Sequence, residues 1–465
     1  MSNILSKKDS KRRDFVLRGN MWNVVLSISL PLAIYNCFNS LFGFLDTLMA
    51  AQISSEVVSA VAYLSQIKNT VSAIGTGLAV GGGIIIARYY GAGDMKNARK
   101  NVNTLLFLAI SIGCALLVLI IPFTKPLLRL INTPEELISI GSNYFIIEIV
   151  MIVSIFINNV YIAVEKAKGN TKKILYLNLM VLGIKLPLTA LFIYVFKFGV
   201  TMMAVATLIA HLTLTIIGMW DLLRPENVFR LSFKDLEISP RVILPIITLA
   251  APIFFERFAF SFGKIIVNSM SVFYGSTVVG ALGVSNNIGG VITGTSGGFQ
   301  EGETAIIGQN LGNGDVDRAL DAFKKTLIVT LVVGGIGFIL IGIFMNQIVG
   351  LFARGDVEFA KEIYGILKYE RYALITLTFT SAVMGFLYGF GYTKLSLVIN
   401  FTRLFIFRIP SLYILQNFTT LGSESVGVAM MVSNCLVGVT AGITCFVVIK
   451  KMKKKSVEEI LVLRG

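Results

Sequence analysis

Two acidic residues, Asp46 and Glu256, lie within long apolar stretches of this chain. A carboxylate inside the hydrocarbon of a membrane costs roughly 2.5–3.5 kcal/mol on insertion scales, so it is expected only where it serves a purpose. Two readings remain open: the acid exchanges a cation, H⁺ or Na⁺, or it is fixed by a neighbouring base. For Glu256 the candidate bases are Arg257 and Lys264. We expect Asp46 and Glu256 to bind a coupling ion.

The stretches that hold these acids indicate a membrane protein. Hydrophobic residues make up 55% of the chain and charged residues only 14%, and the mean hydropathy is +0.78. Soluble domains usually have about a quarter of charged residues, and a helix needs about 20 apolar residues to cross the hydrocarbon. Twelve stretches meet this length, at 22–50, 57–87, 102–122, 138–163, 174–196, 199–220, 242–270, 276–300, 326–346, 372–390, 395–415 and 425–449. Glycine-rich runs of this length favour helices over barrel strands.

The chain consists of two copies of one unit. The segment 91–98 returns at 312–319, offset by 221 positions, and Pro31 returns as Pro252 at the same offset. Further equivalent pairs, at offsets of 222 and 223, are Asn178 and Asn400, Lys185 and Arg408, and Pro187 and Pro410. Six predicted spans fall in each copy, so the repeat and the span count agree.

Basic residues indicate the orientation. With both termini on the cytoplasmic side, 28 lysines and arginines fall on the inner connections and ends, against seven on the outer connections. Positively charged loops stay inside. We therefore expect a multi-pass protein of the cell membrane (plasma or inner membrane) with both termini in the cytoplasm. The net charge of +15 is then a topology signal, and nucleic acid is not expected as a partner.

The repeat and the orientation together predict the fold class. Six crossings return the chain to its starting side, so both copies insert with the same orientation. We predict an all-α polytopic membrane protein with 12 transmembrane helices in two six-helix lobes, related by a pseudo-two-fold axis along the membrane normal. The predicted lobes are residues 1–222 and 242–465, joined by a cytoplasmic linker at 223–241. We expect a monomer whose lobes rock around a central site.

Other classes of function find little support. The chain has no G-x-x-x-x-G-K-[ST] loop for nucleotide phosphates, and its single histidine and four cysteines lie within the spans. These residues offer no catalytic pair, zinc cluster or disulfide framework. We expect neither an enzyme nor a cofactor. The repeated Gly-x-Gly-Asp is expected to end one helix and to cap the next through Asp94 or Asp315.

Several motifs together resemble a known family. They are 43–50 (Gly-Phe-Leu-Asp-Thr-Leu-Met-Ala), the loop 91–94 with its counterpart at 308–315, and 254–256 (Phe-Phe-Glu). In this order, over the whole chain, they are similar to the multidrug and toxic compound extrusion (MATE) family, in its NorM- or DinF-like bacterial branch. The resemblance implies a central cleft and the export of amphipathic, often cationic, organic compounds in exchange for Na⁺ or H⁺. It also implies that Asp46 and Glu256 take part in coupling.

The chain departs from the family pattern at two places. NorM-like members carry a further carboxylate on helix 10, whereas 372–390 contains none and has Phe379 near that position. On helix 5 the family often carries Asn near a proline, whereas this chain has Lys185 before Pro187. The resemblance therefore does not extend to a Na⁺ site built from helices 7 and 10, or to a proton site on helix 5.

Cations within the spans are the least expected feature, and two explanations remain open. The six residues are Lys68, Lys185, Arg257, Lys264, Arg403 and Arg408. In the first explanation Lys185 pairs with Glu148, and Lys264 extends outward to water. In the second the cations meet an anionic substrate. The second keeps an alternative function in the same superfamily, a flippase or exporter of an anionic or lipid-linked compound.

The central cleft is expected to collect polar residues from several helices. Its candidates are Gln66, Asn69, Lys185, His211, Asn287 and Arg408. The most polar spans, 57–87 and 276–300, are equivalent in the repeat, although polar packing between helices would look the same. His211 could relay protons, but a lone histidine that is hydrogen-bonded between helices is the commoner case. Glu301 and Glu303 are expected in water at the cytoplasmic mouth.

Overall fold

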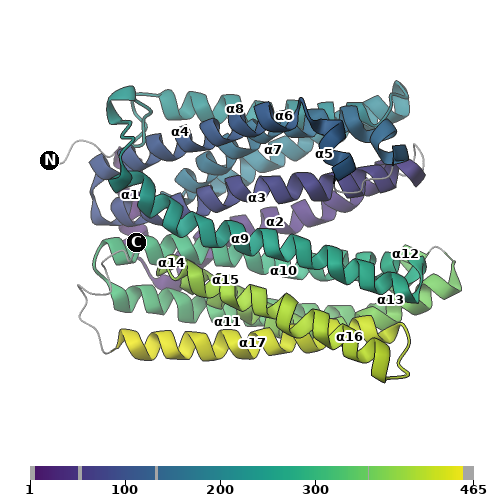
Figure 1. Cartoon of the computed structure of the whole chain (residues 1–465). Helices are drawn as coiled ribbons and strands as arrows, with labels where there is room; N and C mark the ends of the chain where they lie inside the picture. Colours follow the sequence, from purple (N-terminus) through teal and green to yellow (C-terminus); the bar gives the residue numbers. More distant parts are fainter. Residues whose placement is uncertain (1–5, 51–54, 131–134, 354, 454–465) are drawn as a thin grey trace. The chain divides into compact units, whose positions relative to one another are not determined.

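Long helices dominate the computed structural model, as the apolar stretches predict (Figure 1). The structure describes residues 6–50, 55–130, 135–353 and 355–453, with their side chains except those of 42–60, 62, 63, 130, 135–137, 139 and 140. No strand occurs within these ranges. The all-α fold class is therefore confirmed.

The chain divides into two compact units. Unit 1 contains Met1–Arg18 and Leu41–Phe254, and unit 2 contains Gly19–Ser40 and Phe255–Arg464. These units differ from the predicted lobes at two segments, because the beginning of the first long helix belongs to unit 2 and the beginning of the seventh belongs to unit 1. Each unit is described by itself below.

Unit 1 is built around a group of packed helices. Its elements are α1 (Lys7–Arg18), the end of α2 (Met21–Ala50), α3 (Ser55–Ala92), α4 (Met95–Ile120), α5 (Thr124–Leu130), α6 (Glu135–Ala167), α7 (Thr171–Ala190), η1 (Leu191–Val195), α8 (Thr201–Leu223), η2 (Phe233–Asp235) and the start of α9 (Pro240–Ser271). Helix α6 packs against α3, α4 and α8, and α7 packs against α8. Long apolar side chains such as Phe156 and Tyr161 fill the space between these helices.

Unit 2 repeats this plan with the second copy of the sequence. Its elements are the start of α2, the rest of α9, η3 (Val272–Tyr274), α10 (Ser276–Gly312), α11 (Val316–Ile343), α12 (Met345–Ala353), α13 (Val357–Glu370), η4 (Arg371–Ala373), α14 (Leu374–Gly389), α15 (Thr393–Phe401), η5 (Thr402–Arg408), α16 (Ile409–Phe418) and α17 (Glu424–Met452). Helix α14 packs against α10, α11 and α17. The run from α15 to α16 lies beside α17 (Figure 1).

Eleven helical stretches of the described residues are long and apolar enough to cross a membrane. The predicted span that is not among these eleven, 276–300, corresponds to α10, which has 37 residues. At about 1.5 Å per residue it is long enough to cross, but its many glycine, serine, threonine and asparagine residues lower its hydropathy. All twelve predicted stretches therefore coincide with helices, and the twelve-helix architecture is confirmed.

Glycines explain the two exchanged segments, which are the start of α2 in unit 2 and the start of α9 in unit 1. In unit 2, a Cβ on Gly298 of α10 would lie 2.2 Å from the backbone nitrogen of Ala33 in α2. In unit 1, a Cβ on Gly77 of α3 would lie 3.0 Å from the backbone nitrogen of Phe254 in α9. Both pairs are related by the 221-residue offset of the repeat. Only glycine permits such close helix contact, so the same device holds α2 against α10 and α9 against α3.

The repeated Gly-x-Gly-Asp loop has the predicted structural role. Gly93 and Gly314 adopt positive φ angles of 79° and 82°, which suit glycine. The carboxylate of Asp94 accepts a hydrogen bond from the backbone N–H of Asn97 at 3.1 Å, and Asp315 accepts one from Arg318 at 2.8 Å. The predicted helix caps are confirmed at the starts of α4 and α11.

One helix begins earlier than the sequence predicts. The stretch predicted at 372–390 is the end of a longer helical run, Val357–Gly389, formed by α13, η4 and α14. Its first half was missed because charged residues lower the local hydropathy, and one of these, Lys368, pairs with Glu424 of α17 at 2.7 Å. The run therefore includes an acid, Glu370, that the predicted span lacked.

Candidate functional site

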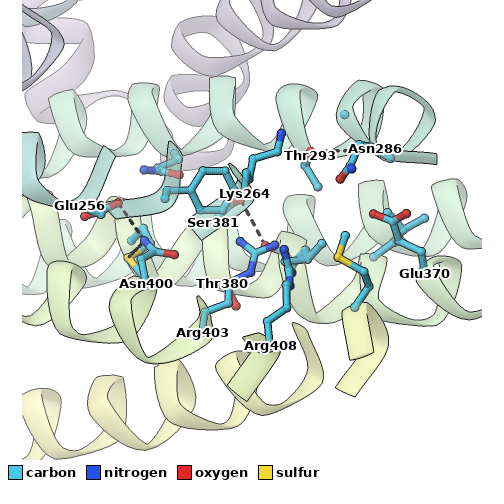
Figure 2. A pocket seen from close by; sticks show the side chains of 18 of the residues that line it. Glu256, Lys264, Asn286, Thr293, Glu370, Thr380, Ser381, Asn400, Arg403 and Arg408 are labelled. Carbon is cyan, nitrogen blue, oxygen red and sulfur yellow. Dashed lines mark hydrogen bonds between the residues drawn. The ribbon is translucent and has the colours of Figure 1, made fainter. Parts of the chain in front are cut away.

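A polar cavity lies within unit 2 (Figure 2). Its volume is about 330 Å³, and helices α9, α10, α14, α15 and α17 with α13 and η5 contribute to its wall. Its charged residues are Glu256, Arg257, Lys264, Glu370, Arg403 and Arg408. Cations thus outnumber carboxylates in the wall, which is unusual for a site inside a membrane.

Glu256 is the predicted coupling acid that the structure describes. Its side chain on α9 is buried, with 6% exposed. The hydroxyl of Tyr388 donates to both carboxylate oxygens, at 2.8 and 2.9 Å, and Nδ2 of Asn400 donates to Oε1 at 2.8 Å. No lysine or arginine of the described chain forms a salt bridge with Glu256. Neither Arg257 nor Lys264 therefore clamps this acid by a salt bridge, although Arg257 attracts it electrostatically.

A wide helical turn positions two arginines of the wall. In η5 the backbone forms π-helical turns, and the N–H of Ile409 donates to the carbonyl of Leu404, five residues before it. Pro410 follows immediately and cannot fit a regular helical turn, because it lacks an N–H and clashes with the carbonyl four residues earlier. The wider turn relieves this conflict. It brings Arg403 and Arg408, five positions apart, to the same face.

The two arginines share one acceptor on α17. Nε of Arg403 donates to Oδ1 of Asn434 at 2.9 Å, and Nη2 of Arg408 donates to the same atom at 2.5 Å. Nε of Arg408 also donates to Oγ of Ser433 at 3.0 Å. Arg408 and Asn434 are buried, with 3% and 0% exposed. Figure 2 shows both guanidinium groups directed into the cavity from the same side.

Lys264 and Glu370 complete the charged wall. Lys264 lines the cavity, and its Nζ lies 5.9 Å from the ring centroid of Phe260. The expectation that Lys264 extends outward to water is therefore wrong. Glu370 is buried and accepts a hydrogen bond from the hydroxyl of Ser285. Glu370 forms no salt bridge with any described residue, so it does not neutralise Lys264 directly.

The other predicted site residues lie elsewhere. The backbone of Asp46 lies in α2, but its side chain is outside the described residues. In unit 1, Gln66 is half-buried on α3, Asn69 is exposed on α3, and Lys185 is half-buried on α7. In unit 2, Asn287 is exposed on α10, while its neighbour, Asn286, lines the cavity. The roles given to these residues stay predictions.

The acid that was expected to pair with Lys185 has another partner. Glu148 of α6 forms a salt bridge with Lys68 of α3 at 2.8 Å. In the same unit, the carbonyl of His211 accepts a hydrogen bond from Nδ2 of Asn158 at 3.0 Å, but the ring Nδ1 is buried without a hydrogen-bond partner among the described residues. The helix-to-helix bond at this position is thus made by the backbone of His211.

Glu303 differs from its expected solvent exposure. Its side chain is 0% exposed, and neither carboxylate oxygen has a hydrogen-bond partner in the described part of the chain. It packs against Gly385 of α14, where a Cβ would lie 2.5 Å from Oε2 of Glu303. The expectation that Glu303 lies in water at the cytoplasmic mouth is therefore wrong, because the close contact between α10 and α14 covers this acid.

Several residues of this site were missed by sequence reasoning. Tyr388, Asn400 and Asn434 are uncharged residues in apolar spans, and only Asn400 carried a signal, as the repeat equivalent of Asn178. Glu370 was missed with the first half of its helical run. No group of three or more metal-ligating side chains occurs among the described residues, and the four cysteines are free. The charged and polar side chains of the wall suit ion pairing and proton or cation exchange.

Comparisons with known proteins agree with this architecture. A family model described as MatE matches residues 31–191 and 252–414, which are more than half of the chain. The probable multidrug resistance protein YoeA of Bacillus subtilis is 25% identical over 342 residues, covering 72% of this chain and 74% of that protein. The FAD transporter of Shewanella oneidensis is 22% identical over 450 residues, covering 92% of this chain and 95% of that protein.

Solved structures of similar fold are also transporters. An outward-facing conformation of a multidrug resistance MATE family transporter of the MOP superfamily has a TM-score of 0.90 at 20% identity and covers 97% of this chain and 100% of its own. A MOP superfamily transporter from Pyrococcus furiosus, described with a binding pocket of reverse polarity, has the same TM-score, identity and coverage. At this identity the likeness shows the fold.

Proposed function

Because this chain belongs to the MatE family, and one of its relatives is named a probable multidrug resistance protein, we propose that it is a secondary active antiporter. It exports amphipathic organic compounds in exchange for H⁺ or Na⁺. It works in the cell membrane as a monomer, with both termini in the cytoplasm and without a cofactor. Small organic molecules are its substrates, and no enzymatic step is part of the proposal.

The environment of Glu256 is the observation that carries this proposal. The acid is buried, lines a cavity and is held by two uncharged donors, Tyr388 and Asn400. A basic partner would neutralise the carboxylate permanently. Uncharged donors instead stabilise the carboxylate while leaving its negative charge available to an incoming cation. This arrangement supports ion exchange at Glu256.

Coupling follows from the charge of Glu256. An ion shifts a conformational equilibrium only by the difference between its affinities for the two states. Neutralising Glu256 favours the state in which this side chain is most shielded from water, and substrate binding favours the opposite state. One elementary charge that moves through 100 mV supplies about 2.3 kcal/mol, which drives substrate uphill.

The two candidate ions make different demands on the site. A proton needs only the carboxylate, whereas Na⁺ takes several oxygen ligands. Tyr388 offers one oxygen, and Asn400 would have to turn its amide, because Nδ2 now faces Glu256. Asp46 remains the second proposed coupling acid, in the end of α2 that belongs to unit 1.

Transport by proteoliposomes under an imposed gradient tests the proposal. The vesicles contain ethidium, an organic cation, or carboxyfluorescein, an organic anion, and either a pH or a Na⁺ gradient is applied alone. Wild-type protein should move one of these probes with one gradient, and Glu256→Gln should lose this dependence. Glu358→Gln is the matched control, because Glu358 is exposed at the start of α13. Gradient-driven transport by Glu256→Gln at the wild-type rate would refute the assignment.

A second candidate function is favoured by the surplus of cations in the unit 2 cavity. In this alternative the chain exports or flips an anionic or lipid-linked compound. The similar protein from Shewanella oneidensis is named an FAD transporter, and FAD carries phosphates. Transport of carboxyfluorescein but not of ethidium in the experiment above would support this alternative.

A further inference from the structure

Three cations meet in the unit 2 cavity without a salt bridge to a carboxylate of the described chain. Lys264 extends from α9, and Arg403 and Arg408 extend from η5 (Figure 2). Nζ of Lys264 and Cζ of Arg403 lie 5.9 and 5.4 Å from the centroid of one ring, that of Phe260. Within the described ranges of the chain, no salt bridge joins any of the three cations to a carboxylate.

The acids of the wall offset the charge of these cations only in part, because Glu370 attracts all three without forming a salt bridge with any of them. Glu256 is engaged by Tyr388 and Asn400, and Glu370 by Ser285. Buried cations are costly unless they are paired. A negatively charged ligand in the cavity would therefore be stabilised by every one of these cations.

The two arginines are already held in place to bind an anion. Both guanidinium groups donate to the amide oxygen of Asn434, which holds them in place without adding a negative charge. Of the five N–H donors of each arginine, the hydrogen bonds of the described structure use one on Arg403 and two on Arg408. The remaining donors form a planar fork that matches the oxygens of a carboxylate or a phosphate.

The rest of the wall suits an apolar ligand body. Leu374, Leu377, Met384 and Met430 line the cavity together with Phe260. Its volume of about 330 Å³ is at the small end of the range of roughly 300–1,000 Å³ for small-molecule sites. The ligand is therefore compact, with one anionic end and one apolar end.

We infer that this cavity binds an amphipathic organic anion whose carboxylate or phosphate contacts Lys264, Arg403 and Arg408. That this anion is also the exported substrate rests on the proposed transport function. The binding step is independent of any gradient, so it can be tested separately from ion coupling.

Calorimetric titration of the purified full-length protein with three probes tests the inference. The probes share an aromatic body and differ in charge: phenyl phosphate is an anion, benzyl alcohol is neutral, and phenyltrimethylammonium is a cation. Phenyl phosphate should bind about tenfold or more tightly than either of the others, because charge-assisted hydrogen bonds to arginine are the strong ones. Equal affinities, or tighter binding of the cation, would overturn the inference.

Variants locate the binding in this cavity. Lys264→Met and Arg403→Gln should each weaken phenyl phosphate by about tenfold and leave benzyl alcohol unchanged. Lys264 has no hydrogen bond in the described structure, so its replacement should not disturb the fold, and thermal melting checks this. The control is Lys394→Gln. Lys394 lies on the same helical run as Arg403, but it is exposed at the start of α15. Unchanged affinity in Lys264→Met and Arg403→Gln would overturn the assignment to this cavity.

The choice of lipid distinguishes the two sources of the anionic group, a lipid headgroup and a soluble organic anion. In nanodiscs of phosphatidylcholine, phenyl phosphate should bind as in detergent. If the natural ligand is a lipid headgroup, nanodiscs of phosphatidylglycerol should suppress this binding; if it is a soluble organic anion, binding should persist in both. Either result supports an anion site, whereas absence of phenyl phosphate binding in all three media would contradict it, whatever the outcome of the gradient experiment.

Discussion

Arg403 and Arg408 donate hydrogen bonds to one and the same atom, Oδ1 of Asn434. Two positive groups are thereby held close together by an uncharged side chain inside a membrane-spanning unit. The π-helical turns of η5 place the arginines five positions apart on one face, and α17 supplies the acceptor. The arrangement keeps the cations oriented without neutralising them, as an anion site requires.

Replacement of Asn434 by aspartate should offset the charge of Arg403 and Arg408 while still holding them in place. Asn434→Asp provides a carboxylate to both arginines, so we expect a higher melting temperature and at least tenfold weaker binding of phenyl phosphate. Calorimetric titration and thermal melting measure the two effects. Tighter binding of phenyl phosphate in Asn434→Asp would contradict the anion site.

Tyr388 should tune the affinity of Glu256 for its ion. Its hydroxyl donates to both oxygens of the carboxylate and so stabilises the ion-free form. Tyr388→Phe removes this donor, and if the exchanged ion is H⁺, we expect the proton concentration for half-maximal exchange to fall by about tenfold. Tyr413→Phe, which changes an exposed tyrosine on α16, is the control. An unchanged or higher half-maximal concentration would show that the Tyr388 bond does not act on the exchanging group.

The buried Glu303 should tolerate loss of its charge. Both of its oxygens lack a hydrogen-bond partner in the described chain, and an unpaired ionised carboxylate at such a place is costly. Glu303→Gln keeps the shape of the side chain, so we expect an unchanged or higher melting temperature, with Glu358→Gln as the exposed control. A fall of several degrees would reveal a charged partner of Glu303.

The glycine contacts between helices should limit stability. A Cβ on Gly298 would meet the backbone of Ala33, so Gly298→Ala should lower the free energy of unfolding by about 1–3 kcal/mol. Gly335→Ala on α11 is the matched control, because nothing lies within 4 Å of a Cβ there. That control should be neutral or stabilising by about 0.5–1 kcal/mol. Equal melting temperatures for the two variants would remove the steric explanation of the exchanged segments.

The length and spacing of apolar runs sufficed to predict the helices, because a membrane imposes a minimum length on every crossing. The same criterion placed the helix that ends at Gly389 too late, since Lys361, Lys368 and Glu370 lower the hydropathy of its first half. The exchanged helix segments could not be predicted either. They depend on which residues face Gly77 and Gly298, and hydropathy carries no such information.

The site was only partly predictable for a related reason. Glu256 and Arg408 stood out because charges in apolar spans are costly. Tyr388 and Asn434 did not, because uncharged polar residues are common in helix packing. Their importance arises from contacts between distant parts of the chain, such as the 132 positions that separate Tyr388 from Glu256. The cation surplus was visible in the sequence, but the sharing of one acceptor by Arg403 and Arg408 depends on the wide turn.

The central claim is that Glu256 binds and releases the coupling ion, and ion binding to the purified protein measures this most directly. Radioactive sodium binding and proton uptake, followed with a pH indicator, are compared between wild type and Glu256→Gln. We predict that the wild-type protein binds one H⁺ or one Na⁺ per molecule more than the variant does, and that Glu358→Gln matches the wild type. Equal ion binding by wild type and Glu256→Gln would contradict the account.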